Sequence, residues 1–244
     1  MTDISQSEGL STHRCPHCSY LQLMVRARIP LDRVDEIGNC STRRLGPFHS
    51  GDFIFRDGDR SGAIYIVQSG AVKTQYISFE GDLQVSGFYL AGEIFGLDDT
   101  GEKVHRSDAI ALERTWICEI SLDRLESICA ELPLFQHEIL GLYGQQLRHT
   151  RGLWINNRNV SAEERIFCFL KDLYQRTTQR LGNVTEIRLP MRKSDIASFL
   201  SLTPEHLSRV LHEFEQAGLI RNHFRTIEYL DPQAFTTRNC APVN

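Results

Sequence analysis

The chain has 244 residues, of which 41% are hydrophobic and 24% charged, and its net charge is −4. This composition is that of a globular protein long enough for two domains, and it excludes a collagen-like, low-complexity or uniformly basic chain. No apolar run reaches the roughly 20 residues that span a bilayer, and residues 1–14 lack the apolar centre of a signal peptide. We therefore expect a cytoplasmic protein with no membrane partner.

The chain carries seven cysteines, at positions 15, 18, 40, 118, 129, 168 and 240. In a reducing compartment an odd number of cysteines predicts thiols or metal ligands rather than a disulfide framework. The sequence suggests no role for Cys129, Cys168 or Cys240.

Residues 40–120 have the pattern of a β-domain. Short apolar or alternating runs recur at 63–67, 71–77 and 115–120, among others, and Gly-Asp, Asp-Gly or Ser-Gly pairs separate them. Short strands at intervals of about 8–12 residues are typical of a sandwich or barrel.

Residues 132–157 then change to a helical period. Apolar and polar side chains follow a 3-4-3-4-3 spacing at Leu140, Tyr143, Leu147, Thr150, Trp154 and Asn157. This spacing is typical of a coiled-coil seam and favours a dimerisation helix. The alternative is a core helix packed on the barrel.

A second helical region begins at Ser161. Ser161 and Glu164 match a capping box, which predicts an amphipathic helix that starts here. A Gly182-Asn183 turn and a short strand at 186–190 follow.

Residues 194–217 match two short helices joined by a tight turn. The turn covers 201–203, Thr203 can cap the second helix, and Pro204 suits its first position. This arrangement predicts a helix-turn-helix, whose second helix lies in the major groove. The alternative is an ordinary helical hairpin with a solvated polar face.

The second helix presents groups that can read bases. Leu207, Val210, Leu211 and Phe214 form its apolar stripe, so the polar residues lie on the other side. Arg can donate two hydrogen bonds to guanine, Glu can accept from cytosine, and Ser can do either. After Gly218, two short strands flank a basic turn at 222–225 that can serve as a wing. The predicted DNA contacts are Glu205, His206, Ser208 and Arg209 on the helix, with Arg192, Lys193 and Arg225 as phosphate contacts.

Four segments resemble the CRP/FNR superfamily of transcription regulators: 51–59, 64–70, 92–96 and Glu205-x-x-Ser208-Arg209. The last of these is similar to the recognition helix of the FNR branch. The resemblance implies an α+β fold made of a cyclic-nucleotide-binding-type β jelly roll, a long dimerisation helix and a C-terminal winged helix-turn-helix. It also implies a homodimer on double-stranded DNA, TTGAT-like palindromic half-sites and RNA polymerase as a partner.

This resemblance divides the chain into four parts. Residues 1–26 form a cysteine-containing sensor segment, and 27–131 form the β-roll. Residues 132–160 form the dimerisation helix, and 161–244 form the DNA-binding domain.

Cyclic-nucleotide binders of this fold hold the phosphate with an Arg-Ser pair and the ribose with a Glu. Arg106-Ser107 resembles the pair, and a guanidinium suits a phosphate. The position of the Glu is occupied by Leu97, although Asp98 and Asp99 follow. A ribose would therefore lack its acceptor or find one displaced by a residue.

The FNR branch senses oxygen through a [4Fe–4S] cluster on four cysteines. Cys15, Cys18 and Cys118 resemble three of these ligands, but Met24 stands where the third N-terminal cysteine is expected. A neutral thioether is a poor replacement for a thiolate. Cys40 is the best substitute, and His13 or a nearby carboxylate are others.

Three interpretations of these cysteines stay open: a cluster, a thiol or zinc switch at Cys15-x-x-Cys18, or no sensor chemistry. The sequence therefore predicts a DNA-binding regulator that responds to oxygen or redox state, with a cyclic-nucleotide- or other small-ligand-gated regulator as the alternative. An enzyme is disfavoured, since the chain offers no nucleophile elbow, P-loop or zinc-protease helix.

Overall fold

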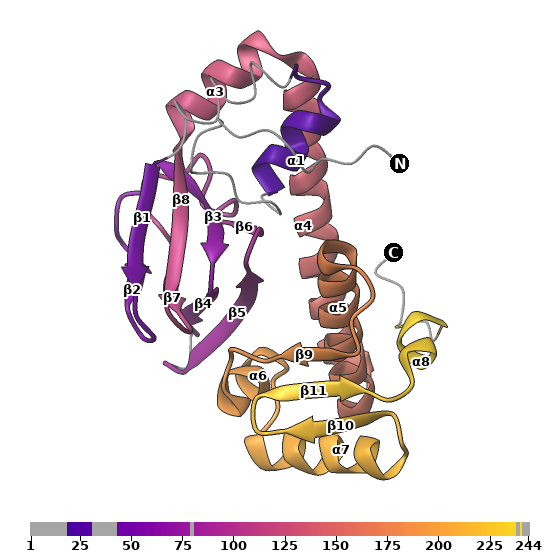
Figure 1. The fold of residues 1–244 in the computed structure, drawn as a ribbon. Coiled ribbons are helices and arrows are strands. Elements are labelled where there is room, and N and C mark those ends of the chain that lie inside the picture. Colours follow the sequence, from indigo (N-terminus) through magenta and orange to yellow (C-terminus); the bar gives the residue numbers. More distant parts are fainter. Residues whose placement is uncertain (1–18, 31–42, 79–80, 238–239, 241–244) are drawn as a thin grey trace.

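The computed structural model describes residues 19–30, 43–78, 81–237 and 240 (Figure 1). Within them, a β-roll and a smaller C-terminal domain lie beside a long helix, α4 (Pro133–Asn159). This α+β architecture is the predicted one.

Two four-stranded antiparallel sheets form the β-roll, with strand orders β1-β8-β3-β6 and β2-β7-β4-β5. The strands are β1 (Arg43–Phe48), β2 (Phe53–Phe55), β3 (Ala63–Ser69), β4 (Ala71–Ile77), β5 (Leu83–Leu90), β6 (Ile94–Phe95), β7 (Asp108–Ala111) and β8 (Thr115–Ser121). Side chains alternate across each strand, so Tyr65 and Val67 enter the core between the sheets together with Phe55, Phe95 and Ile117.

The turn between β3 and β4 requires glycine. Gly70 has φ +86°, and a Cβ there would lie 2.4 Å from Oγ1 of Thr115. The chain can reverse here only because residue 70 has no side chain.

The outer face of the first sheet is covered by helices. α1 (Ser19–Arg26), α3 (Leu122–Glu131) and α4 pack on it and enclose a second core. Its members include Leu23, Met24, Ile64, Ile66, Ile120, Phe135 and Ile139. Met24 is fully buried among them, so it acts as a core residue.

The C-terminal domain has its own core. Its elements are α5 (Ala162–Leu181), β9 (Glu186–Arg188), α6 (Lys193–Phe199), α7 (Pro204–Gln216), β10 (Ile220–His223), β11 (Thr226–Tyr229) and α8 (Pro232–Thr237), and its sheet has the order β10-β11-β9. Ser161 Oγ accepts a hydrogen bond from the Glu164 amide (3.2 Å) and caps α5 as predicted. Tyr229 donates to the Leu170 carbonyl (2.8 Å), which ties the sheet to α5.

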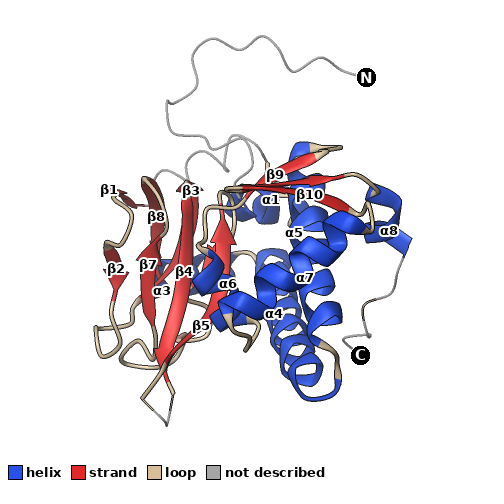
Figure 2. Ribbon diagram, turned by 90° about the horizontal axis from the view of Figure 1, so that it is seen from below, coloured by secondary structure: helices blue, strands red, loops and turns tan. Residues whose placement is uncertain are grey.

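The β-roll and the C-terminal domain meet where α6 lies against the edge strand β5 (Figure 2). The Val85 amide of β5 donates to Oγ of Ser198 on α6 (3.0 Å), and the Phe88 and Phe199 rings lie 5.2 Å apart. Lys73 on β4 forms a 2.6 Å ion pair with Asp195 on α6. The first helix of the predicted helix-turn-helix therefore docks on the β-roll.

Candidate nucleic-acid interface

The turn between α6 and α7 is built from local capping signals. Oγ1 of Thr203 accepts a hydrogen bond from the His206 amide (3.2 Å), and Pro204 occupies the first turn of α7, as predicted. Ser201 has φ +53°, a conformation that glycine adopts more readily. The chain thus reverses between the two helices within the three residues that the sequence indicated.

Arg165 on α5 holds this turn from behind. Its guanidinium donates to the carbonyls of Leu200 (2.6 Å) and Ser201 (3.4 Å), which follow the last residue of α6. Burial lowers the pKa of the Arg165 guanidinium. Sequence reasoning missed this residue, because nothing in the local pattern shows that α5 passes behind the turn.

The two faces of α7 are distinct. Leu207, Val210 and Leu211 are buried against the domain core, whereas Glu205, Ser208 and Arg209 are exposed and His206 is half-buried. Arg209 forms a 2.7 Å ion pair with Glu213 one turn later. The helix therefore presents an acid, a hydroxyl and a guanidinium to solvent, the groups suited to base edges.

The other predicted DNA contacts lie beside α7. Arg192 and Lys193 are exposed at the start of α6, and Arg225 is exposed in the turn between β10 and β11. Phe224, at the tip of the same turn, is 92% exposed. All these elements are at the end of the molecule opposite α3 (Figure 1). Their role as contacts stays a prediction.

α4 uses one face for the β-roll and leaves another uncovered. Ile139 and Tyr143 pack with the second core, while Leu140 and Leu147 are 61% and 67% exposed. The side chains of Thr150, Trp154 and Asn157 lie outside what the structure describes. The core-helix interpretation holds for the face that carries Ile139 and Tyr143, so Tyr143 packs on the β-roll although the sequence assigned it to the seam. Pairing of two chains through Leu140 and Leu147 stays a prediction.

Of the predicted sensor ligands, Cys15, Cys18 and Cys40, with the alternative His13, lie outside the described residues. Cys118 is half-buried on β8 and packs on the same core as Met24. In the part of the chain that the structure describes, no group of three or more His, Cys, Asp or Glu residues is arranged to hold a metal ion.

The described residues do not form a cyclic-nucleotide site of the expected kind. Leu97 is buried in place of the ribose carboxylate. The Asp99 carboxylate accepts a hydrogen bond from Nδ1 of His105 (2.6 Å) and another from the Arg106 amide (3.1 Å). Both of its oxygens are therefore already hydrogen-bonded within the protein. Asp98 is exposed, and partial desolvation together with the neighbouring Asp99 carboxylate raises the pKa of its carboxyl. The Arg106 side chain is 71% exposed.

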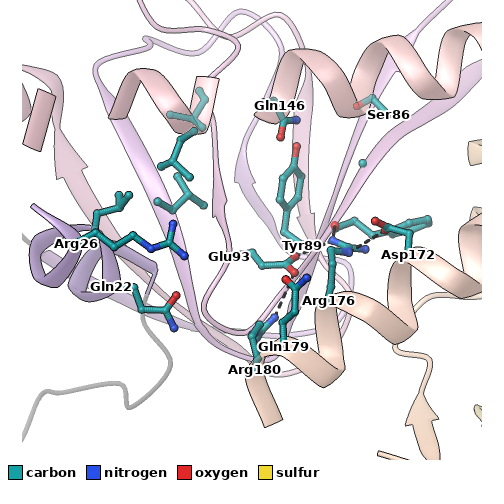
Figure 3. A pocket seen from close by; sticks show the side chains of 16 residues that line it. Gln22, Arg26, Ser86, Tyr89, Glu93, Gln146, Asp172, Arg176, Gln179 and Arg180 are labelled. Carbon is teal, nitrogen blue, oxygen red and sulfur yellow. Dashed lines mark hydrogen bonds and ion pairs between the residues drawn. The ribbon is translucent and has the colours of Figure 1, made fainter. Parts of the chain in front are cut away.

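A cavity of about 460 Å³ lies where α1, β5, α4 and α5 meet (Figure 3). At its wall, Glu93 of the β-roll pairs with Arg176 (2.9 Å) and Arg180 (3.3 Å) of α5. Arg26 and Gln146 also line it. This ion-pair cluster is a second link between the β-roll and the C-terminal domain.

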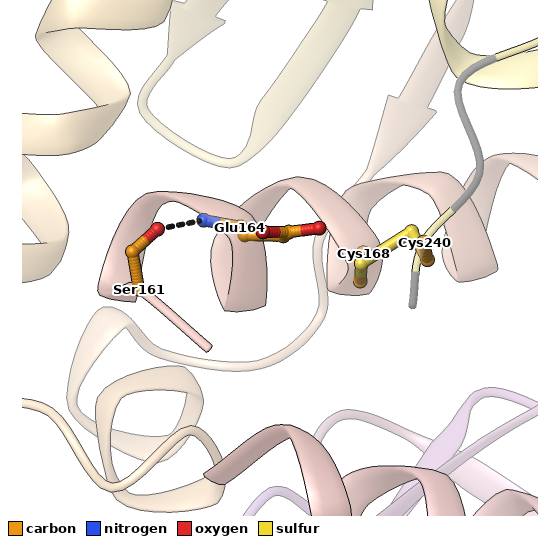
Figure 4. The surroundings of a disulfide bond; sticks show 4 residues. All are labelled: Ser161, Glu164, Cys168 and Cys240. Carbon is orange, nitrogen blue, oxygen red and sulfur yellow. Dashed lines mark hydrogen bonds between the residues drawn. A yellow bond between two sulfur atoms is a disulfide. The ribbon is translucent and has the colours of Figure 1, made fainter. Parts of the chain in front are cut away.

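One expectation about cysteines is wrong. Cys168 on α5 and Cys240 after α8 form a disulfide across 72 residues of sequence (Figure 4). The sequence predicted no disulfide and no role for either residue. The pair arises because the buried Phe235 of α8 stacks on Phe167 and returns the end of the chain to α5, a tertiary contact with no local signal.

Comparisons with known proteins agree with this architecture. The Crp-like helix-turn-helix domain matches residues 164–238, and the cyclic nucleotide-binding domain matches residues 46–131. No helix in the described ranges combines the length and apolar character that a membrane crossing needs.

The chain is 32% identical over 241 residues to the fumarate and nitrate reduction regulatory proteins of Salmonella typhimurium and of Escherichia coli, which covers 97% of this chain and 96% of each relative. Its fold is similar to that of FixK2 from Bradyrhizobium japonicum, with a TM-score of 0.71, 24% identity, and coverage of 83% of this chain and 98% of that one. A CooA variant from Carboxydothermus hydrogenoformans gives a TM-score of 0.63 at 20% identity, covering 80% and 85%. The chain belongs to the CRP/FNR family of DNA-binding transcription regulators, which are not enzymes.

Proposed function

We propose that this regulator binds TTGAT-like palindromes as a homodimer and controls transcription in response to oxygen or redox state. The observation that carries the proposal is α7, whose buried stripe fixes the helix while Glu205, Ser208 and Arg209 face solvent. The sequence Glu205-x-x-Ser208-Arg209 resembles the FNR-branch recognition helix. We propose that Glu205 and Arg209 select bases and that Arg192, Lys193 and Arg225 contact phosphates.

We propose that α4 pairs two copies of the chain. Leu140 and Leu147 are seven residues apart, so they lie on one face of the helix, and both are exposed. Isolated leucines on a surface are common, but two on one stripe of a 27-residue helix suit a coiled-coil seam. The division into 1–26, 27–131, 132–160 and 161–244 belongs to this proposal. Such a regulator acts with RNA polymerase as its partner. It also requires a location in the cytoplasm.

The sensor part of the proposal rests on Cys15, Cys18 and Cys118, which resemble the FNR-branch ligands. Cys118 packs beside the core that contains Met24 of α1, which supports a sensor site between the N-terminal part of the chain and β8. A [4Fe–4S] cluster would supply oxygen-sensitive chemistry, with Cys40 as the fourth ligand. The alternative use of Cys15 and Cys18 is a thiol or zinc switch.

We propose that the signal reaches DNA through the two interdomain links. Glu93 ties the β-roll to α5, and Lys73 ties it to Asp195 of α6. A shift of the β-roll against α4 would move α6, and with it the spacing of the two recognition helices. A coupling of roughly 1–3 kcal/mol is enough to change occupancy several-fold or more.

The second candidate function is a regulator gated by a small ligand, and the cavity beside Glu93 favours it. Titration calorimetry with cyclic AMP distinguishes the cyclic-nucleotide form of this alternative. We expect no heat of binding, because Leu97 replaces the ribose acceptor.

The test of the sensor proposal is anaerobic purification followed by iron and sulfide analysis, a visible spectrum and DNA binding before and after exposure to air. We expect air to change affinity for a TTGAT palindrome and a Cys118→Ser variant to lose that response, whereas Cys129→Ser keeps it. If the protein is colourless and free of iron but its DNA affinity still changes on exposure to air, the thiol switch is the mechanism that remains. An air-insensitive protein would contradict redox sensing.

A further inference from the structure

The C-terminal end of the chain is joined to α5 by two cysteines. The Cα atoms of Cys168 and Cys240 lie 5.6 Å apart, within the usual range for a disulfide, and their sulfurs are bonded (Figure 4). Neither residue takes part in the sensor set proposed above. Their pairing therefore needs an explanation of its own.

Helix α8, which precedes Cys240 in the chain, is held in place without the disulfide. Phe235 of α8 is fully buried, and its ring centroid lies 4.8 Å from that of Phe167 and 4.8 Å from that of Tyr229. Reduction of the bond would leave α8 anchored on α5. The two thiols would stay close to each other, so the effective concentration for closing the bond again would be high.

Both cysteines are half-buried rather than enclosed, so a small thiol or disulfide can reach them. This step rests on the proposed function, since a chain that acts on chromosomal DNA works in a reducing compartment. Disulfides in such compartments are rare, and those that form are usually transient and redox-sensing or catalytic. A bond across 72 residues of a DNA-binding regulator suits the redox-sensing class.

We propose that Cys168 and Cys240 form a reversible thiol–disulfide site that reacts with low-molecular-weight disulfides of the glutathione class. One thiolate attacks a sulfur of the small disulfide, which forms a mixed disulfide and releases one small thiol. The second thiolate attacks the protein sulfur of that mixed disulfide and releases the other small thiol. Two electrons pass from the cysteine pair to the small disulfide, and the two thiol protons end on the released thiols.

Oxidation closes a loop that contains the whole helix-turn-helix. Residues between 168 and 240 include α6, α7 and both wing strands. A cross-link of this length restricts the unfolded state of the enclosed region, so the oxidised domain resists unfolding more than the reduced one. The site would thus stabilise the DNA-reading part of the chain under oxidising conditions, independently of Cys118.

The experiment incubates the full chain in glutathione buffers of increasing oxidised fraction, followed by alkylation and peptide mapping. We expect a cross-linked peptide pair containing Cys168 and Cys240 that disappears in reduced glutathione and returns on reoxidation. The thermal midpoint of the C-terminal domain should be higher by at least about 5 °C in the oxidised form. Cys168→Ser and Cys240→Ser should lose both the cross-link and the shift, and Cys129→Ser, also half-buried and on a helix, should keep both.

Four results would overturn the proposal. In the first, both cysteines are still alkylated after incubation in oxidised glutathione; in the second, the cross-link persists in reduced glutathione. In the third, only one of the two cysteines carries a glutathione adduct and no cross-link forms. In the fourth, the Cys168→Ser variant keeps the rise in thermal midpoint. None of these readouts uses DNA. Failure of the cysteine pair and failure of the proposed DNA-binding function are therefore separate outcomes.

Discussion

Replacing Arg209 with alanine tests the recognition helix most sharply. The side chain is 59% exposed on α7 and is paired only with Glu213, on the same helix, among the contacts that the structure describes. An exposed ion pair of this kind contributes about 0.3–0.5 kcal/mol, so its loss should hardly change folding stability. A bidentate contact to guanine discriminates against the wrong base by about 1–3 kcal/mol.

Two copies of Arg209 act in a dimer on a palindrome. The expected loss in binding free energy is therefore roughly 2–6 kcal/mol, or at least about 30-fold in affinity. Glu213→Gln is the matched control, because it frees Arg209 from its ion pair and should leave affinity equal or raise it by up to about fivefold.

Fluorescence anisotropy with a labelled palindrome, single-base variants and a scrambled duplex measures the effect. We expect Arg209→Ala to weaken binding to the palindrome, to relax the choice at one base pair per half-site, and to leave binding to the scrambled duplex nearly unchanged. An equal loss on every duplex, with a salt slope reduced by about one charge per subunit, would show that Arg209 contacts phosphate and would refute the base-reading assignment.

Three further predictions concern stability. Thr203→Ala removes the side-chain cap of α7 and should lower the unfolding free energy of the C-terminal domain by about 1 kcal/mol in urea titrations. Thr203→Ser keeps a capping hydroxyl and should retain most of that stability. Gly70→Ala should lower the unfolding free energy of the β-roll by more than about 2 kcal/mol. Gly58 is the control, because it has φ +88° and nothing lies within 4 Å of a Cβ built there, so Gly58→Ala should cost only about 1 kcal/mol. Equal losses in the two variants would contradict the contact with Thr115. The Asp98 side chain is exposed, but partial desolvation by the atoms around it and the neighbouring Asp99 carboxylate raise the pKa of its carboxyl. The stability that this group contributes is therefore present below its unfolded pKa near 4 and is lost as the pH rises through the folded value. Asp98→Asn should therefore raise the thermal midpoint at pH 7 relative to the unsubstituted chain, and raise it less at pH 4. Thermal melts at both pH values measure this, and the same gain at pH 7 and pH 4 would contradict the prediction.

The helix-turn-helix could be predicted from sequence because its signals are local. Thr203 caps α7, Pro204 starts it, and the apolar stripe at Leu207 and Val210 has the spacing of a buried helix face. The strands of the β-roll were recognisable for the same reason, since turn residues such as Gly70 separate short apolar runs. These features depend on neighbours within a few positions along the chain.

The connections between domains could not be predicted. Lys73 and Asp195 are 122 residues apart in sequence, and each looks like an ordinary surface charge in its own segment. Arg165 supports a turn that follows 35 residues later, and Cys168 meets Cys240 only because Phe235 anchors α8. Such pairs are set by how finished elements pack, which periodicity and capping signals do not encode.

The most direct test of the central claim, that α7 reads DNA as part of a dimer, is a paired measurement of specificity and stoichiometry. Binding to a TTGAT palindrome and to a scrambled duplex is measured at one salt concentration, and sedimentation gives the number of chains per duplex. The account predicts two chains per palindrome and a preference of at least roughly 1,000-fold over the scrambled duplex. Equal affinity for both duplexes, or one chain per palindrome under reducing and oxidising conditions alike, would contradict it.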